Sequence, residues 1–154
     1  MLTATAAALR DDDVESLHRA ELVTRVKAVA EFEGALAAYK LRLASAIDAL
    51  KDDGLNSRGV LRSHGGVAGK TAARLADTAA GLAEMPRTRA ALDAGRITIE
   101  HATILARAGE EIDPARADEE LVGVAESGPA DIVAKRVRGW VGQRTKPTLN
   151  TDEN

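Results

Sequence analysis

The sequence predicts an all-α fold in which a long N-terminal helix packs with a bundle of about six shorter helices. Only three aromatic residues, Phe32, Tyr39 and Trp140, occur among 154 residues, while alanine recurs throughout. The core therefore has to be built from Leu, Ile, Val and close Ala contacts between helices. No segment shows the alternation of a β-strand. A chain of this length forms one domain, which we place at residues 1–143; the polar residues 144–154 are expected to be a disordered tail or a truncated linker.

The first predicted element is a long helix over about residues 14–52, a segment without proline. The acidic run from Asp11 to Asp13 precedes it and is suited to cap its N-terminus. Gly54 is expected to end it in the left-handed conformation. A strict seven-residue repeat forms an apolar stripe along this helix: Leu22, Val29, Leu36, Leu43 and Leu50. Such a stripe packs either on the rest of the chain or on a second copy, so a homodimer through these residues is one expected partnership.

The following residues predict shorter helices, each with its own start or stop signal. A helix-turn-helix-like unit covers residues 57–84, with Asn56 or Ser57 at its start and a turn at Gly65-Gly66. Further helices are expected over residues 86–94, 98–108, 114–126 and 129–142. Gly95 is expected to end the first of these and Thr98 to cap the second.

The residues available for catalysis or metal binding are few. The absence of cysteine excludes disulfides and thiolate metal ligands, and three histidines remain. Glu15 and His18 have the Glu-x-x-His spacing of di-metal bundles, but neither His64 nor His101 has a glutamate three residues before it to supply the second pair. We therefore expect no metal, no cofactor and no catalytic residue in this chain.

Two other motifs are better explained by structure than by chemistry. In "GGVAGKT", His64 stands where a P-loop requires its first glycine, and the preceding residues read as helix rather than strand. In "ITIEHATIL", Glu100 and His101 are adjacent on a helix and point about 100° apart, so they do not converge on one atom. We expect Glu100 to favour the helix N-terminus and His101 to be a packed or polar-edge residue.

The middle third of the chain is basic. Residues 56–107 hold eight Lys and Arg against four Asp and Glu, although the whole chain has a net charge of -3. The stretch "VLRSHGGVAGKTAARL" has the layout of a unit that places its second helix in a major groove of DNA. The residues expected to contact duplex DNA are Arg58, Arg62, Lys70, Thr71 and Arg74, the two on the first helix at phosphates. The same turn also occurs in helical bundles that touch no nucleic acid.

No segment has the length of apolar residues that a membrane span requires, and the N-terminus lacks the pattern of a signal peptide. We therefore expect no membrane partner and a cytoplasmic location.

The order of these features resembles the helical domain of the actinobacterial 13E12 repeat family. The resemblance is carried by "AARLADTAAGLAEMP", "ALDAGRITIEHATILARA" and "DIVAKRVRGWV", and it extends to about Gln143. This domain, whose own function is not known, commonly precedes an HNH endonuclease domain in actinobacteria and their phages. The resemblance implies a partner nuclease domain in cis or in trans. No HNH pattern occurs in the present chain, so no catalytic role is carried over.

The sequence thus favours a non-catalytic helical module that binds or positions duplex DNA for an HNH nuclease. The alternatives are a module for oligomerisation or regulatory protein interaction that acts through the apolar stripe, and a helix-turn-helix transcription regulator.

Overall fold

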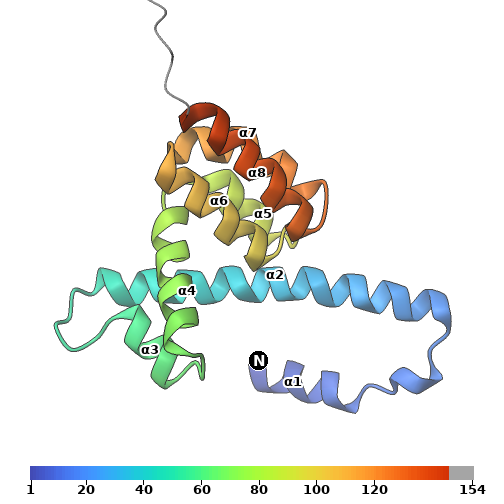
Figure 1. The fold of residues 1–154 in the computed structure, drawn as a ribbon. Helices are drawn as coiled ribbons and strands as arrows, with labels where there is room; N and C mark the ends of the chain where they lie inside the picture. The colour runs from blue at the N-terminus through green and yellow to red at the C-terminus, as the bar shows by residue number, and fades with distance from the viewer. Residues whose placement is uncertain (146–154) are drawn as a thin grey trace, which may run out of the picture.

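The structure is a computed structural model that describes residues 1–145. These residues form eight α-helices and one 3₁₀ turn, without a strand, which confirms the all-α prediction. The elements are α1 (Leu2–Asp11), η1 (Val14–Ser16), α2 (Arg19–Ala49), α3 (Ser57–Ser63), α4 (Gly69–Leu82), α5 (Pro86–Asp93), α6 (Ile99–Glu111), α7 (Pro114–Glu126) and α8 (Ala130–Thr145). In Figure 1, α2 runs across the molecule with α5 to α8 gathered on one side of it, and α4 crosses α2 between α3 and this bundle.

The N-terminal end of the long helix differs from the prediction. α2 begins at Arg19, and the backbone N–H of His18 donates to Glu21 Oε2 at 2.9 Å, which satisfies the end of the helix from within its own first turn. Asp11 instead ends α1, and Asp12 forms an ion pair with Arg25. The expectation that the acidic run caps the long helix is therefore wrong, because a separate helix occupies the residues before it.

The C-terminal end of α2 also differs. The helix ends at Ala49, and Lys51, with φ of 51°, takes the left-handed conformation that we expected at Gly54. Asn56 then caps α3, as predicted, by accepting the Gly59 N–H at 2.7 Å.

Two glycines allow α2 to cross the turn between α5 and α6 at backbone contact. Gly95 has φ of +73°, which confirms it as the stop of α5, and a Cβ at this position would lie 2.5 Å from Glu31 Cα. A Cβ on Gly34 would lie 3.0 Å from Gly95 Cα. Side chains at either position would separate the long helix from the bundle.

The bundle is organised around α6, which packs against α4, α7 and α8. Its buried face is made largely of small residues around Leu105, as the alanine-rich composition predicts. A buried carboxylate joins two of the surrounding helices: Asp118 of α7 accepts the backbone N–H groups of Arg87 at 3.0 Å and Thr88 at 2.7 Å, and the Thr88 hydroxyl at 2.7 Å. Asp118 thus caps α5 from a neighbouring helix.

The apolar stripe of α2 does not pack on the described part of the chain. Its five residues are exposed, at 41% for Leu22, 45% for Val29, 41% for Leu36, 47% for Leu43 and 67% for Leu50. The residues of α2 that enter the core are instead Gly34, Ala38, Leu41 and Ala44. Of the two partners that the pattern left open, packing on the chain itself is not observed among residues 1–145.

The last helix is longer than expected. α8 continues to Thr145, and the Arg144 guanidinium lies 4.1 Å from the centre of the Trp140 ring and donates to Glu120 Oε2 at 3.2 Å. The rest of the predicted tail, 146–154, lies outside the described residues. Within residues 1–145, no helix has the length and apolar character needed to cross a membrane.

Candidate nucleic-acid interface

The residues predicted to contact DNA lie on α3 and α4, which pack against each other across the turn at residues 64–68. Gly66 has φ of +67°, so the predicted glycine turn is present. The two helices keep the layout of a helix-turn-helix unit. We call the exposed residues Arg58, Arg62, Lys70, Thr71 and Arg74 the basic face.

Hydrogen bonds to the end of α2 orient α3. Ser57 is buried and donates its N–H to Asp48 Oδ1 at 2.8 Å and its hydroxyl to Asp48 Oδ2 at 2.6 Å. Both bonds lower the pKa of the Asp48 carboxyl, and the bond from the hydroxyl has the larger effect. With Ser57 and Leu61 facing inward, Arg58 and Arg62 remain on the exposed side of α3, one turn apart.

The first turn of α4 has no side-chain cap. Its N-cap residue is Ala68, whereas side chains cap the N-termini of α3, α6 and α7, and Asp118 caps α5. Lys70, Thr71 and Arg74 are exposed around this end, while Ala72 is buried between them. Uncapped N–H groups beside two cations form a local environment that favours an anion.

The cations of the basic face are available for a ligand. None of Arg58, Arg62, Lys70 and Arg74 forms an ion pair within residues 1–145. By contrast, carboxylates of the same chain engage five other arginines: Arg25, Arg42, Arg96, Arg116 and Arg144.

A groove of about 590 Å³ between α4 and α6 is lined by Lys70 and Arg74 of α4 and by Arg107 of α6. The pairing of these two helices could not be read from the sequence, so Arg107 was not predicted. Arg58, Arg62 and Thr71 do not line this groove.

The groove changes in charge along its length. The Thr78 and Thr103 hydroxyls lie 3.3 Å apart, and a Cβ on Gly81 would lie 3.1 Å from Ala106 Cβ, so α4 and α6 run parallel. Lys70 and Arg74 therefore mark one end, and the part that follows is lined by the acidic residues Asp77, Glu84 and Glu110 with Arg107 among them. An anionic ligand is favoured only at the end nearest α3.

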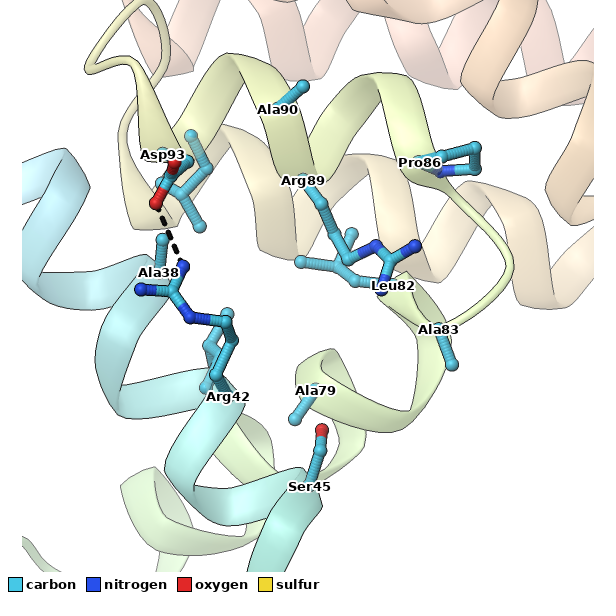
Figure 2. A pocket seen from close by; sticks show the side chains of 12 residues that line it. Ala38, Arg42, Ser45, Ala79, Leu82, Ala83, Pro86, Arg89, Ala90 and Asp93 are labelled. Atoms are coloured by element: carbon cyan, nitrogen blue, oxygen red, sulfur yellow. Dashed lines mark hydrogen bonds and ion pairs between the residues drawn. The ribbon is translucent and has the colours of Figure 1, made fainter.

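A second hollow of about 410 Å³ lies among α2, α4 and α5 (Figure 2). Arg42 donates to Asp93 at 2.8 Å at its edge, and Arg89 also lines it. Its wall is mostly apolar, with alanines and Leu82. Ser45 is the one hydroxyl among its lining residues and has no histidine beside it there, so the arrangement offers a binding surface without a nucleophile–base pair.

Of the adjacent Glu100 and His101, His101 has a structural role, and Glu100 lies in the first turn of α6. The Thr98 N–H donates to His101 Nδ1 at 3.0 Å, so Nδ1 is an acceptor and the proton is on Nε2, which donates to the Gly128 carbonyl at 2.8 Å. Thr98 also accepts the His101 N–H, as the predicted cap of α6. The imidazole thus connects the start of α6 to the turn between α7 and α8, while Glu100 is exposed.

Among residues 1–145, no group of three or more His, Asp or Glu side chains is arranged to hold a metal ion. Glu15 lies in the 3₁₀ turn and His18 precedes α2, so the two do not share a helix.

Comparison with protein-family models, with curated proteins and with solved structures yielded no match to the chain.

Proposed function

We propose that this chain is a non-catalytic helical module that contacts duplex DNA through the basic face of α3 and α4. The observation that carries the proposal is a set of four exposed cations without ion-pair partners in residues 1–145, on two helices packed as a helix-turn-helix unit.

The uncapped start of α4 adds to the attraction for phosphate. Backbone N–H groups at a helix N-terminus donate to phosphate oxygens, and the helix dipole favours negative charge there. Lys70 and Arg74 lie within the first two turns, so their charges act at the same place.

The acidic part of the α4–α6 groove limits the mode of contact. Asp77 follows Arg74 on the same face of α4 and would repel the backbone of DNA that entered deeply. We therefore propose contact mainly with phosphates, which positions DNA without reading its sequence. This mode fits a module that helps a nuclease better than it fits a transcription regulator, which needs base contacts.

The sequence resemblance to the 13E12 repeat family suggests the setting for this contact. Domains of that family commonly precede an HNH endonuclease domain, so we propose such a nuclease domain, in cis or in trans, as a partner. In this proposal the nuclease cuts and the present chain holds duplex DNA near it.

A salt titration of duplex binding tests the DNA proposal. If Arg58, Arg62, Lys70 and Arg74 each neutralise one phosphate, log K should fall with log salt at a slope of about -3.6. A Lys70→Glu, Arg74→Glu double variant should abolish binding at low salt. The matched control is Arg87→Glu, Arg89→Glu, which makes the same charge change at exposed positions of α5. Absence of binding by the natural chain at low salt, or equal loss in both double variants, would remove the proposal.

The exposed stripe of α2 favours a second function, association with a protein. Five large aliphatic side chains in one row are each at least 41% exposed, and a continuous apolar row of this kind is typical of an interaction surface. The nuclease domain and a second copy of the chain are the two candidate partners.

A further inference from the structure

The apolar stripe lies on the side of α2 opposite the bundle. At 100° per residue, Ala38 lies about 200° and Leu41 about 140° around the helix from Leu36. Since Ala38 and Leu41 are buried against the bundle and Leu36 is 41% exposed, a partner on the stripe would not collide with the core on this helix.

The N-terminal half of α2 needs such a partner more than the rest of the helix does. Every residue from Arg19 to Glu33 is exposed. Helices in water owe most of their stability to the packing of an apolar face, and within residues 1–145 this half meets the bundle only through Glu31, whose backbone lies beside Gly95. Phe32, at 43% exposure, and Val26, at 71%, extend the apolar surface beside the stripe.

A second row beside the stripe contains one charge of each sign. Val26, Glu33, Lys40 and Ile47 are spaced by seven residues, like the stripe itself, and follow each stripe residue from Leu22 by four positions. Glu33 and Lys40 are both exposed, and neither forms an ion pair within residues 1–145. These two charges lie at the centre of the apolar surface rather than at its ends.

The charges distinguish the possible orientations of a second copy. In a parallel pair in register, Glu33 would face Glu33 and Lys40 would face Lys40, and like charges at a helix interface are destabilising. In an antiparallel pair centred between these residues, Glu33 of each copy lies beside Lys40 of the other. The surface is therefore self-complementary in the antiparallel orientation, as an interface around a two-fold axis requires.

We propose that the stripe binds a second copy of this chain, with the two α2 helices antiparallel and Glu33 of each copy paired with Lys40 of the other. This inference rests on the proposed association through the stripe and names its partner and orientation; it is independent of DNA binding. The apolar row continues over four heptad steps, a length at which a heptad pattern indicates a coiled coil. The pairing also places the two basic faces on symmetry-related sides of one particle.

Light scattering behind a sizing column, with the full chain over a range of concentrations, tests the inference. The natural chain should be a dimer and Leu36→Asp a monomer. Lys40→Glu should raise the dissociation constant at least tenfold, since it places two glutamates together at both pairs. Glu33→Lys combined with Lys40→Glu should restore the dimer, because the charges are then exchanged. The control is Lys27→Glu, an exposed position outside the stripe, which should leave the dimer unchanged.

The outcomes separate the orientation from the association. A natural chain that stays monomeric at every concentration overturns both. A dimer that Leu36→Asp disrupts but Lys40→Glu does not would retain the association and overturn the antiparallel pairing. A double variant that remains monomeric would also overturn it. Circular dichroism of each variant checks that the helices are intact.

Discussion

The two halves of α2 share one continuous helix but differ in what they contact. From Gly34 onward, small residues bury one face against α4 and α5. The helix crosses the turn at Gly95 at backbone contact through Glu31 and Gly34, where the two halves meet. From Arg19 to Glu33 no residue is buried, and in the described residues the ion pair of Arg25 with Asp12 is the one side-chain bond of this half that reaches beyond α2 and its N-cap residue His18. The apolar stripe runs through both halves and is exposed in both.

This difference shows that the exposed apolar stripe of α2 and its face toward the core are made by different residues. The large aliphatic side chains of α2 form the stripe, whereas Gly, Ala and one Leu form its face toward the core. Stability should therefore depend on the bundle and its junction with α2, and hardly at all on the exposed half.

The crossing of α2 over the bundle should be the most sensitive point. Gly95→Ala places a Cβ 2.5 Å from Glu31 Cα in a left-handed conformation, so we expect a loss of about 2–4 kcal/mol in the free energy of unfolding by urea. Gly139→Ala is the control, because its helical position has open space and should gain up to about 1 kcal/mol. Equal effects of the two substitutions would mean that α2 does not contact this turn.

The buried carboxylate of Asp118 should come next. Asp118→Ala leaves the N–H groups of Arg87 and Thr88 without an acceptor in the interior, and we expect a loss of about 2–3 kcal/mol. The neighbouring Glu119→Ala, at an exposed position, should change the unfolding free energy by less than about 0.5 kcal/mol. Calorimetry of the two variants provides the comparison. An Asp118→Ala variant with the unfolding free energy of the natural chain would refute the capping of α5 by Asp118.

His101 tests whether the Glu-His pair is structural. His101→Ala removes the bonds to Thr98 and to the Gly128 carbonyl, and should cost about 1–2 kcal/mol of stability without affecting DNA binding below the unfolding transition. Glu100→Ala should have little effect on either. A stable His101→Ala chain that no longer binds duplex DNA would instead place the imidazole in the interface.

The junction of α2 with α3 should give the smallest effect, and one that depends on pH. Because the hydrogen bonds from Ser57 lower the pKa of Asp48 in the folded state, their contribution is present above the unfolded pKa of about 3.9 and is lost as the pH falls through the lower folded value. Asp48→Asn should therefore be less stable than the natural chain near neutral pH, and the difference should shrink below about pH 4. Urea unfolding of both chains from neutral pH to below about pH 4 measures this difference in stability. A difference that grows on acidification contradicts the lowered pKa of Asp48.

The sequence predicted the helices of the bundle better than the two ends of α2, for identifiable reasons. α7 begins at Pro114 and ends at Glu126 as predicted, because proline and its neighbouring cap mark the start and a Ser-Gly-Pro break marks the end. Gly95 and Thr98 were recognised from the same kind of local signal. Such signals involve residues only a few positions apart, so they can be recognised in the sequence alone.

Contacts between distant elements could not be predicted in the same way. The core face of α2 consists mainly of Gly34, Ala38 and Ala44, which a search for large apolar side chains overlooks. Asp118 reads as one more charged residue of a helix, since its hydrogen-bond partners lie thirty positions earlier. The presence of Arg107 in the groove that Arg74 also lines depends on the pairing of α4 with α6. The basic face and the nearby Asp77 of the same helix follow from the sequence, whereas the place of Glu110 of α6 in the groove does not.

The central claim is that the N-terminal half of α2 is open in the single chain and is covered by a second copy. Hydrogen exchange of the backbone amides, measured at dilute and at high protein concentration, tests it most directly. Residues 19–33 should exchange fast in dilute solution and become protected at high concentration, while α6 and α7 stay protected in both. Protection of residues 19–33 equal to that of α6 in the dilute monomer, or fast exchange at every concentration, would contradict the claim.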